Sequence, residues 1–224
     1  MKLTKAMIYS AAFMGIFAMQ SASAATIVGA VLNNSFEADS IGSTSATSWS
    51  TTNRGFGTSS VAIVGSPGVT DGTRAGTVTV TQGDDYGVVF NQLRSTSDLL
   101  GVGMINGETY TLSADYTPSV TEGPQIEFGY SAFGPGFANY TQNYVVVSGA
   151  GVGVAGVTSN VSINFVFNSD LQSDSFYFEA RTGSYGAPVS FTLDNFKISS
   201  IPEPTSLTLL GLAGGAVALR RRRK

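Results

Sequence analysis

Apolar and polar residues alternate with a period of two along much of the chain between residues 25 and 200. Because successive side chains of a strand point to opposite faces, this period predicts strands with one buried face. The alternation is clearest in four segments: Tyr110–Tyr116, Val161–Phe167, Phe176–Ala180 and Phe191–Leu193. Shorter runs of β-branched or aromatic residues favour further strands at Val61–Val64, Thr77–Thr81, Val88–Leu93, Ile126–Tyr130 and Tyr144–Val147.

Clusters of turn residues separate these runs, among them Gly65–Gly68, Gly83–Asp85, Asn106–Gly107, Gly134–Gly136 and Gly149–Gly156. No stretch of this region shows a sustained helical period of 3.6. About ten strands with short turns predict one all-β domain over residues 25–200, an antiparallel sandwich of two sheets.

Composition narrows the chemistry of this domain. The 224 residues include no histidine and no cysteine, which excludes Ser-His-Asp and Cys-His nucleophiles, histidine or thiolate zinc sites and any disulfide. Charged residues make up 12% of the chain, about half the usual share. Between residues 25 and 200, five basic residues face fourteen acidic ones, a net charge of −9. An acidic surface repels phosphate backbones, so we expect no nucleic-acid partner.

The first 24 residues have the layout of a secretory signal peptide. Lys2 and Lys5 form a basic start, residues 11–19 are apolar, and residues 22–24 (Ala-Ser-Ala) provide a small-residue cleavage site. The apolar run is too short to span a membrane. This pattern predicts export by the secretion machinery and cleavage by signal peptidase after residue 24.

The last 24 residues form a second terminal segment, which we do not assign to the β-sandwich domain. The tripeptide Pro202, Glu203 and Pro204 is stiff and extended, and it cannot continue a strand or lie inside a helix. An apolar run, Leu207–Leu219, follows this tripeptide. As a helix the run would reach only about 20 Å, which is shorter than the roughly 30 Å hydrocarbon core of a membrane. A run of this length suits a transient membrane anchor. The chain ends in a basic tail: Arg220, Arg221, Arg222, Arg223 and Lys224. By the positive-inside rule this tail stays cytoplasmic and the domain faces outward.

The order of these three parts in residues 201–224 resembles the PEP-CTERM protein-sorting signal of Gram-negative bacteria. The resemblance implies recognition by exosortase, a membrane-embedded cysteine transpeptidase that cleaves near the motif. It further implies an inner-membrane-anchored intermediate, then a cell-surface or secreted protein, in a host that makes exopolysaccharide and biofilm. The alternative interpretation is an ordinary tail anchor with a stop-transfer cluster.

Three phrases of the middle region resemble a carbohydrate-binding-module or galactose-binding-like jelly roll. The start, Leu32-Asn33-Asn34-Ser35-Phe36-Glu37 followed by Trp49, is similar to the opening of that family. Residues 107–113 are similar to its middle strand and residues 191–198 to its last strand. The resemblance implies a jelly-roll fold for the sandwich, and a shared fold does not transfer a function.

In that jelly-roll family, a first-strand glutamate and a last-strand aspartate often help to bind a structural Ca²⁺, together with backbone carbonyls. The matching residues are Glu37 and Asp194, so the resemblance implies a candidate calcium site. Hard cations take six to eight oxygen ligands, and such an ion would join the two ends of the domain. The alternative is two exposed acids at strand ends, or an Asp194 that caps a turn. The chain contains no self-contained D-x-D-x-D-G loop.

Candidate glycan-binding residues lie in the Gly/Pro-rich stretch 130–140, which contains Tyr130, Phe133, Phe137 and Tyr140. Aromatic planes can stack on the C–H faces of sugars, and carboxylates can accept hydrogen bonds from sugar hydroxyls. The alternative is that Phe133 and Phe137 close the end of the core. Trp49, the only tryptophan, is expected in the core or at its rim.

Two functions therefore compete. The first is an exported, exosortase-sorted cell-surface or matrix protein, non-catalytic, whose jelly roll binds extracellular polysaccharide or acts only structurally. The second is a secreted polysaccharide-active enzyme of β-sandwich type that uses a carboxylate pair. No motif selects such a pair among the acids, and the glycines at 151–153 lack the lysine and the following helix of a phosphate-binding loop. We therefore expect a binding protein rather than an enzyme.

Overall fold

The structure is a computed structural model that describes residues 24–53, 58–82, 88–119, 126–134, 140–148, 154–169, 175–182 and 189–201. The chain divides into one compact unit, residues 26–200, and a second unit made of residues 1–25 and 201–224. The signal peptide up to residue 23, the PEP tripeptide, the basic tail and Phe137 lie outside the described residues.

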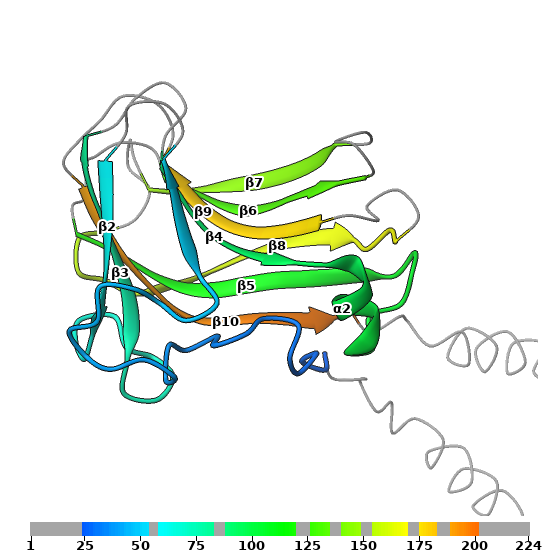
Figure 1. Cartoon of the computed structure of the whole chain (residues 1–224), viewed down its shortest axis with the longest axis horizontal. Helices are drawn as coiled ribbons and strands as arrows, with labels where there is room; N and C mark the ends of the chain where they lie inside the picture. Colours follow the sequence, from blue (N-terminus) through cyan, green and yellow to red (C-terminus); the bar gives the residue numbers. More distant parts are fainter. Residues whose placement is uncertain are drawn as a thin grey trace, which may run out of the picture. The chain divides into compact units, whose positions relative to one another are not determined.

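The described part of the first unit contains two antiparallel five-stranded sheets and one short helix, α2 (Figure 1). One sheet has the order β1-β4-β9-β6-β7 and the other β2-β3-β10-β5-β8. The elements are β1 (Ser50–Asn53), β2 (Thr58–Val64), β3 (Ala75–Gln82), β4 (Val88–Arg94), α2 (Thr96–Gly101), β5 (Thr109–Pro118), β6 (Ile126–Phe133), β7 (Thr141–Ser148), β8 (Ser159–Val166), β9 (Ser175–Thr182) and β10 (Val189–Ser200). The predicted all-β, two-sheet sandwich is confirmed.

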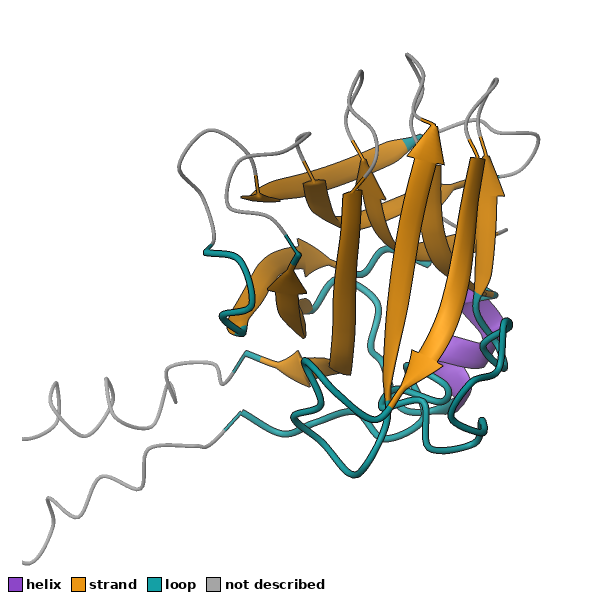
Figure 2. Cartoon of the chain, turned by 90° about the vertical axis from the view of Figure 1, so that its left-hand side faces the viewer, coloured by secondary structure: helices purple, strands orange, loops and turns teal. Residues whose placement is uncertain are grey.

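The chain passes repeatedly from one sheet to the other, as in a jelly roll: β3, β5, β8 and β10 lie in one sheet, and β4, β6, β7 and β9 in the other. Figure 2 shows the strands in two layers, with α2 beside one end of them. Thr26 forms an antiparallel bridge with Ser199, so the two ends of the unit lie side by side.

The strand positions predicted from the period of two become the inner faces of the sheets. In β5, Tyr110, Leu112, Ala114 and Tyr116 are buried, whereas Thr111, Ser113 and Asp115 between them are partly exposed. Between the sheets, aromatic rings make up much of the core. Trp49 stacks on Phe90 with 5.0 Å between ring centroids and contacts Phe196 at 4.4 Å, which places it in the core as expected.

Two elements were not predicted, β1 and α2. The helix has only six residues, too few to show a helical period, and its signal is the cap instead. The hydroxyl of Ser95 accepts a hydrogen bond from the backbone N–H of Asp98, as a helix N-cap does. The segment around Glu37 also differs from expectation, because residues 29–49 form turns and not a first strand.

Candidate functional site

One side of the sheet β1-β4-β9-β6-β7 carries aromatic and charged side chains on its outer surface. In β9, Phe176 and Phe178 are fully buried, so the alternate residues Tyr177, Glu179 and Arg181 point away from the core. The register places these three opposite Ser131, Gly129 and Glu127 of β6, respectively. We use the term aromatic–acidic face for the following set: Glu127, Ser131, Phe133, Tyr140, Tyr144, Tyr177, Glu179 and Arg181.

Gly129 makes room for the central residue of this face. Gly129 lies opposite Tyr144 of the neighbouring strand β7, and a Cβ atom at position 129 would stand 2.0 Å from the carbonyl oxygen of Asn143 and 2.9 Å from the Tyr144 ring. The Tyr144 hydroxyl donates a hydrogen bond to Oε2 of Glu179 on β9. The side chain therefore crosses over β6, which is possible because position 129 has no side chain.

Arg181 links the tyrosine to a second carboxylate. Its guanidinium carbon lies 3.5 Å from the centre of the Tyr144 ring, a cation–π contact, and its Nε donates to Oε2 of Glu127 at 2.6 Å. The ion pair and the ring contact together fix the position of the Arg181 guanidinium. The positive charge is therefore already engaged by this chain's own groups.

Glu179 is a carboxylate that the face itself covers, since its side chain is only 1% exposed. Its Oε1 accepts a hydrogen bond from Ser131 at 3.0 Å, and Oε2 accepts from Tyr144. Burial, followed by the negative charge of Glu179, raises the pKa of Tyr144, so the hydroxyl keeps its proton and remains a donor. Two donors from this chain, Ser131 and Tyr144, therefore hold the Glu179 carboxylate in place.

Aromatic rings gather at one end of the face. Phe133 contacts Tyr140 with 4.7 Å between centroids and meets Tyr177 edge-on at 5.8 Å. Tyr140 is 46% exposed, and Tyr177 and Phe133 are half-buried. The exposed leucine Leu93 lies opposite Tyr177 on β4. This end offers apolar planes to a ligand, next to the polar Glu179 region.

The glycan-binding residues expected from the sequence divide in the structure. Phe133 and Tyr140 lie on the aromatic–acidic face. Tyr130 is 5% exposed and packs between Phe165 and Phe176 in the core, so its ring is not available to a ligand, and we remove it from the candidate site.

The sequence did not indicate six residues of this face: Glu127, Ser131, Tyr144, Tyr177, Glu179 and Arg181. The last three could have been found, because they alternate with the buried phenylalanines of β9 and must share the opposite face. Tyr144 depends on the pairing of β6 with β7, which no local pattern gives.

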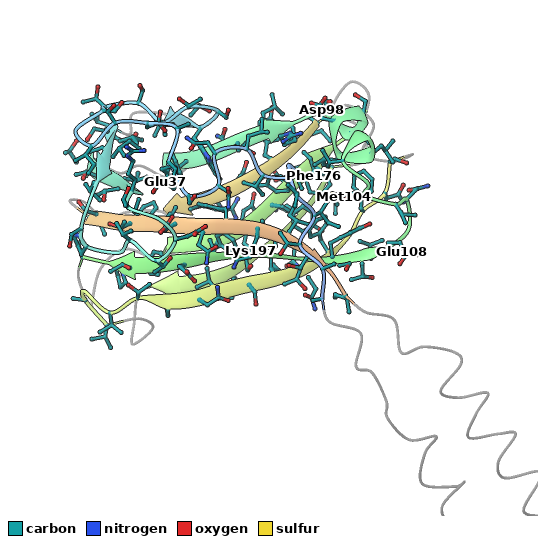
Figure 3. The ribbon with its side chains drawn as sticks, turned by 90° about the horizontal axis from the view of Figure 1, so that it is seen from below. Glu37, Asp98, Met104, Glu108, Phe176 and Lys197 are labelled. Carbon is teal, nitrogen blue, oxygen red and sulfur yellow. The ribbon has the colours of Figure 1, made fainter. Side chains whose placement is uncertain are left out.

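The two candidate calcium ligands bind the loop between β2 and β3 (residues 65–74). Oε1 of Glu37 accepts the backbone N–H groups of Thr73 and Arg74 at 2.6 and 2.8 Å. The Arg74 guanidinium donates to the carbonyl oxygen of Glu37 and, at 3.3 Å, to Oε2. The N–H of Thr73, with smaller contributions from its hydroxyl and from Arg74, lowers the pKa of Glu37 despite some desolvation. Figure 3 shows Glu37 at the end of the sandwich opposite Asp98 of α2.

Asp194 is fully buried and holds the same loop from β10. Its Oδ2 accepts the backbone N–H groups of Thr70 and Asp71 at 2.6 and 2.8 Å, and its Oδ1 accepts that of Asn195 at 2.7 Å. Burial raises the pKa of Asp194, against the effect of these donors.

These contacts do not fit a calcium ion. A hard cation needs oxygen ligands directed at it, whereas here both carboxylates face N–H donors and Glu37 also faces a guanidinium. In the part of the chain that the structure describes, no group of three or more acidic, histidine or cysteine side chains is arranged to hold a metal. Glu37 and Asp194 instead act as two anchors of one loop.

Comparison with known proteins identifies the C-terminal segment. Residues 200–224 match the family of the PEP-CTERM protein-sorting motif. The chain carries a PEP-CTERM sorting signal. A PEP-CTERM signal implies an exported protein that exosortase processes. No curated protein matches the chain in sequence. None of the helices among the described residues has the length and apolar character needed to cross a membrane.

Solved structures similar to the PEP-CTERM chain include carbohydrate-binding modules. The CBM22-1 xylan-binding domain of Paenibacillus barcinonensis Xyn10C is 13% identical, with a TM-score of 0.50 over 76% of this chain and 93% of that one. A carbohydrate-binding module of the β-sandwich superfamily is 14% identical, with a TM-score of 0.50 over 73% and 60%. The Stig cyclase Fisc of Fischerella sp. TAU is 15% identical, with a TM-score of 0.55 over 80% and 99%. At these identities the likeness shows the fold alone, and it confirms the expected jelly roll.

Proposed function

We propose that this exported, PEP-CTERM-bearing protein binds extracellular polysaccharide through its aromatic–acidic face and has no catalytic role. The observation that carries the proposal is the single face on which Tyr144, Tyr177, Phe133 and Tyr140 lie beside Glu127 and Glu179. The xylan-binding module of similar fold supports it as an analogy. Export supports it as well, because it brings the domain to the compartment that holds such polymers.

The chemistry of the face matches that of a sugar chain. Sugar rings present apolar C–H faces, which stack on tyrosine and phenylalanine planes, and hydroxyl groups, which donate to carboxylates. The aromatic end would bind one ring by stacking. The Glu127–Arg181 pair and Tyr144 lie further along the same strands and would bind hydroxyls of the next unit.

The charges of the face favour an uncharged polymer. Glu127 and Glu179 carry two negative charges, and Arg181, the cation of the face, is paired with Glu127. An acidic polysaccharide would therefore meet a site whose positive charge is already engaged, inside a domain that is already acidic. We expect neutral glycans to bind better than uronic-acid polymers.

The test compares variants of the exported protein in binding to immobilised neutral and acidic polysaccharides. Tyr177→Ala removes a half-buried ring that faces Leu93 and Phe133, and Tyr140→Ala removes the exposed one. Each should weaken binding to the preferred polymer about ten-fold or more, on the order of one to three kcal/mol per lost aromatic platform. Ile41→Ala is the matched control, since Ile41 is 61% exposed but packs near Gly65 at the other sheet. Equal binding by all three variants and the parent chain would refute the proposal.

A second candidate, polysaccharide cleavage, has one observation in its favour. The face contains two carboxylates on neighbouring strands, Glu127 and Glu179, as a glycosidase requires. Both are already engaged, Glu127 by Arg181 and Glu179 by Ser131 and Tyr144, which suits binding better than proton transfer. Release of oligosaccharides that stops in Glu179→Gln while binding persists would establish cleavage instead of simple binding.

A further inference from the structure

The two sheets have four edge strands, and three of them are protected. β1 has four residues. The outer edge of β2 is partly paired, because the N–H of Ile63 donates to the carbonyl of Ser43 at 2.9 Å and its carbonyl accepts from Gly42 at 2.8 Å. β7 has a register shift opposite Ile126 and Glu127, which marks a bulge near its end. Short strands, covered edges and bulges are the features that prevent pairing with another chain.

The fourth edge strand, β8, is neither short nor bulged, and β7 of the opposite sheet lies close to it. All eight residues of Ser159–Val166 pair with β5 without a register shift, and within the described residues β8 has no other neighbour in its sheet. Its sequence, SNVSINFV, contains neither charge nor proline. In a domain with a net charge of −9, such a strand is a place where a second copy can approach without meeting like charges along the edge.

The central five residues of β8, residues 160–164, are also self-complementary. Val161 and Ile163 are packed against the core, and Asn160, Ser162 and Asn164 are exposed on the outer surface. In an antiparallel pair of two β8 strands related by a twofold axis through Ser162, Asn160 lies opposite Asn164 and Val161 opposite Ile163. These two pairs, and Ser162 opposite itself, join polar with polar or apolar with apolar on their own side of the sheet, whereas the next pair outward joins Ser159 to Phe165.

The hydrogen bonds of the two asparagines leave complementary groups for this contact. Asn160 donates its side-chain Nδ2 to Oδ1 of Asp115 at 2.8 Å, which directs its amide oxygen elsewhere as an acceptor. Asn164 accepts a hydrogen bond from Thr111 with its Oδ1 at 2.8 Å, which leaves its Nδ2 as a donor. Across the twofold axis, the Asn164 donor of one copy would face the Asn160 acceptor of the other.

We propose that the protein self-associates through β8, which pairs antiparallel with β8 of a second copy and joins the two sheets β2-β3-β10-β5-β8 into one. The half-buried Val161 and Ile163 of each copy become covered in this arrangement. The pairing does not depend on the proposed glycan binding. If both hold, a dimer presents two aromatic–acidic faces, and a polymer that reaches both gains avidity without any new contact.

The test uses the absence of cysteine from the chain. In the proposed pair Ser162 lies opposite itself, at the roughly 4.5 to 5.5 Å separation of Cα atoms in antiparallel neighbours, which a disulfide can bridge. Ser162→Cys in the exported full chain, treated with oxidised glutathione, should give a covalent dimer on a non-reducing gel. The matched control is Ser60→Cys, at an exposed position of the partly covered edge β2. Dimer yield from Ser162→Cys should exceed that of the control several-fold, and equal yields would overturn the proposal.

A second variant measures the association itself. Ser162→Lys places two ammonium groups opposite each other, so light scattering should give half the mass of the parent protein at the same concentration. Ser60→Lys should leave the mass of the dimer unchanged. A parent protein that is monomeric, or a dimer that persists in Ser162→Lys, would rule out this pairing. Polysaccharide binding is measured in a separate assay, so its loss or survival does not decide whether two copies pair through β8.

Discussion

At the scale of single residues, the aromatic–acidic face depends on the space above Gly129. The carbonyl of Asn143 and the ring of Tyr144 occupy the volume that a side chain at this position would need. Gly129→Ala forces the β6–β7 backbone apart, because the nearest obstacle is a backbone atom and not the end of a flexible side chain. We expect a loss of about 1–3 kcal/mol in the free energy of unfolding, together with weaker polysaccharide binding.

Thermal unfolding and the binding assay measure the two effects. The control is Gly101→Ala at the end of α2, where a new Cβ would meet nothing within 4 Å. That change should be neutral or slightly stabilising, since alanine restricts the unfolded chain. If Gly129→Ala melts at the same temperature as the parent protein, the account of Tyr144 crossing over Gly129 is incorrect.

The residues of the candidate site differ in how far the sequence reveals them. Tyr177, Glu179 and Arg181 follow from the period of two once β9 is recognised, because Phe176 and Phe178 must face the core. Tyr130 belongs to the same pattern in β6 and for that reason points inward, with Phe128. The Gly/Pro-rich stretch around Tyr130 favours an exposed ring, whereas the alternation of β6 indicates a buried ring. The alternation is the stronger signal.

At the scale of elements, the loop of residues 65–74 is anchored by carboxylates from two distant segments, Glu37 and Asp194. The pKa of Glu37 is lowered in the folded state, first by the N–H of Thr73. Its contribution to stability is therefore complete above the pKa of the unfolded chain and is lost as the pH falls through the lower folded value. We expect Glu37→Gln to reduce the melting temperature at pH 7 and the difference from the parent to shrink below about pH 4.

The pH series needs a carboxylate outside the loop as its control. Glu108→Gln serves, because Glu108 lies in the turn before β5, at the α2 end of the sandwich (Figure 3). Its curve should run parallel to that of the parent protein. A constant difference between Glu37→Gln and the parent from pH 7 to pH 3 would show that ionisation of Glu37 does not hold the loop.

The strands were predictable where they are long and alternate, and the other elements were not. β5, β8, β9 and β10 have a buried face that the sequence displays directly. The four residues of β1, Ser50–Asn53, have no apolar member, and the strand exists because its backbone pairs with β4. The strand order is likewise set by contacts between segments far apart in sequence. The resemblance to jelly rolls, and not periodicity, indicated the fold, and neither gave the strand order.

At the scale of the whole molecule, the contacts of Glu37 and Asp194 also determine what we expect of calcium binding by the domain. The carboxylates that the jelly-roll resemblance assigns to Ca²⁺ are engaged by backbone N–H groups and by Arg74. We therefore expect the melting temperature of the exported protein to be the same in EDTA and in millimolar Ca²⁺. An increase with Ca²⁺ that disappears in Glu37→Gln would restore the calcium site, and metal analysis of the isolated protein provides an independent check.

The PEP-CTERM sorting signal bears on where the exported domain is finally located. The PEP-CTERM motif at 200–224 implies that exosortase cuts the chain there, which would release the jelly roll from the membrane or transfer it to the cell surface. Replacing Pro202, Glu203 and Pro204 by alanine should leave a longer form that retains residues 207–224 and stays with the membrane fraction.

Intact mass of the protein from membranes and from medium, in a host that contains exosortase, measures this outcome. The matched control changes the next two residues, Thr205 and Ser206, to alanine and keeps the tripeptide. The control and the parent should begin near Ala25 and end near the motif, whereas the tripeptide variant should keep its basic tail. If all three proteins carry the tail, the segment acts as a plain anchor, and the aromatic–acidic face then works at the membrane surface and not in the matrix. Polysaccharide binding and C-terminal processing are tested by changes at different residues. That result would therefore place polysaccharide binding at the membrane surface and would not refute the binding itself.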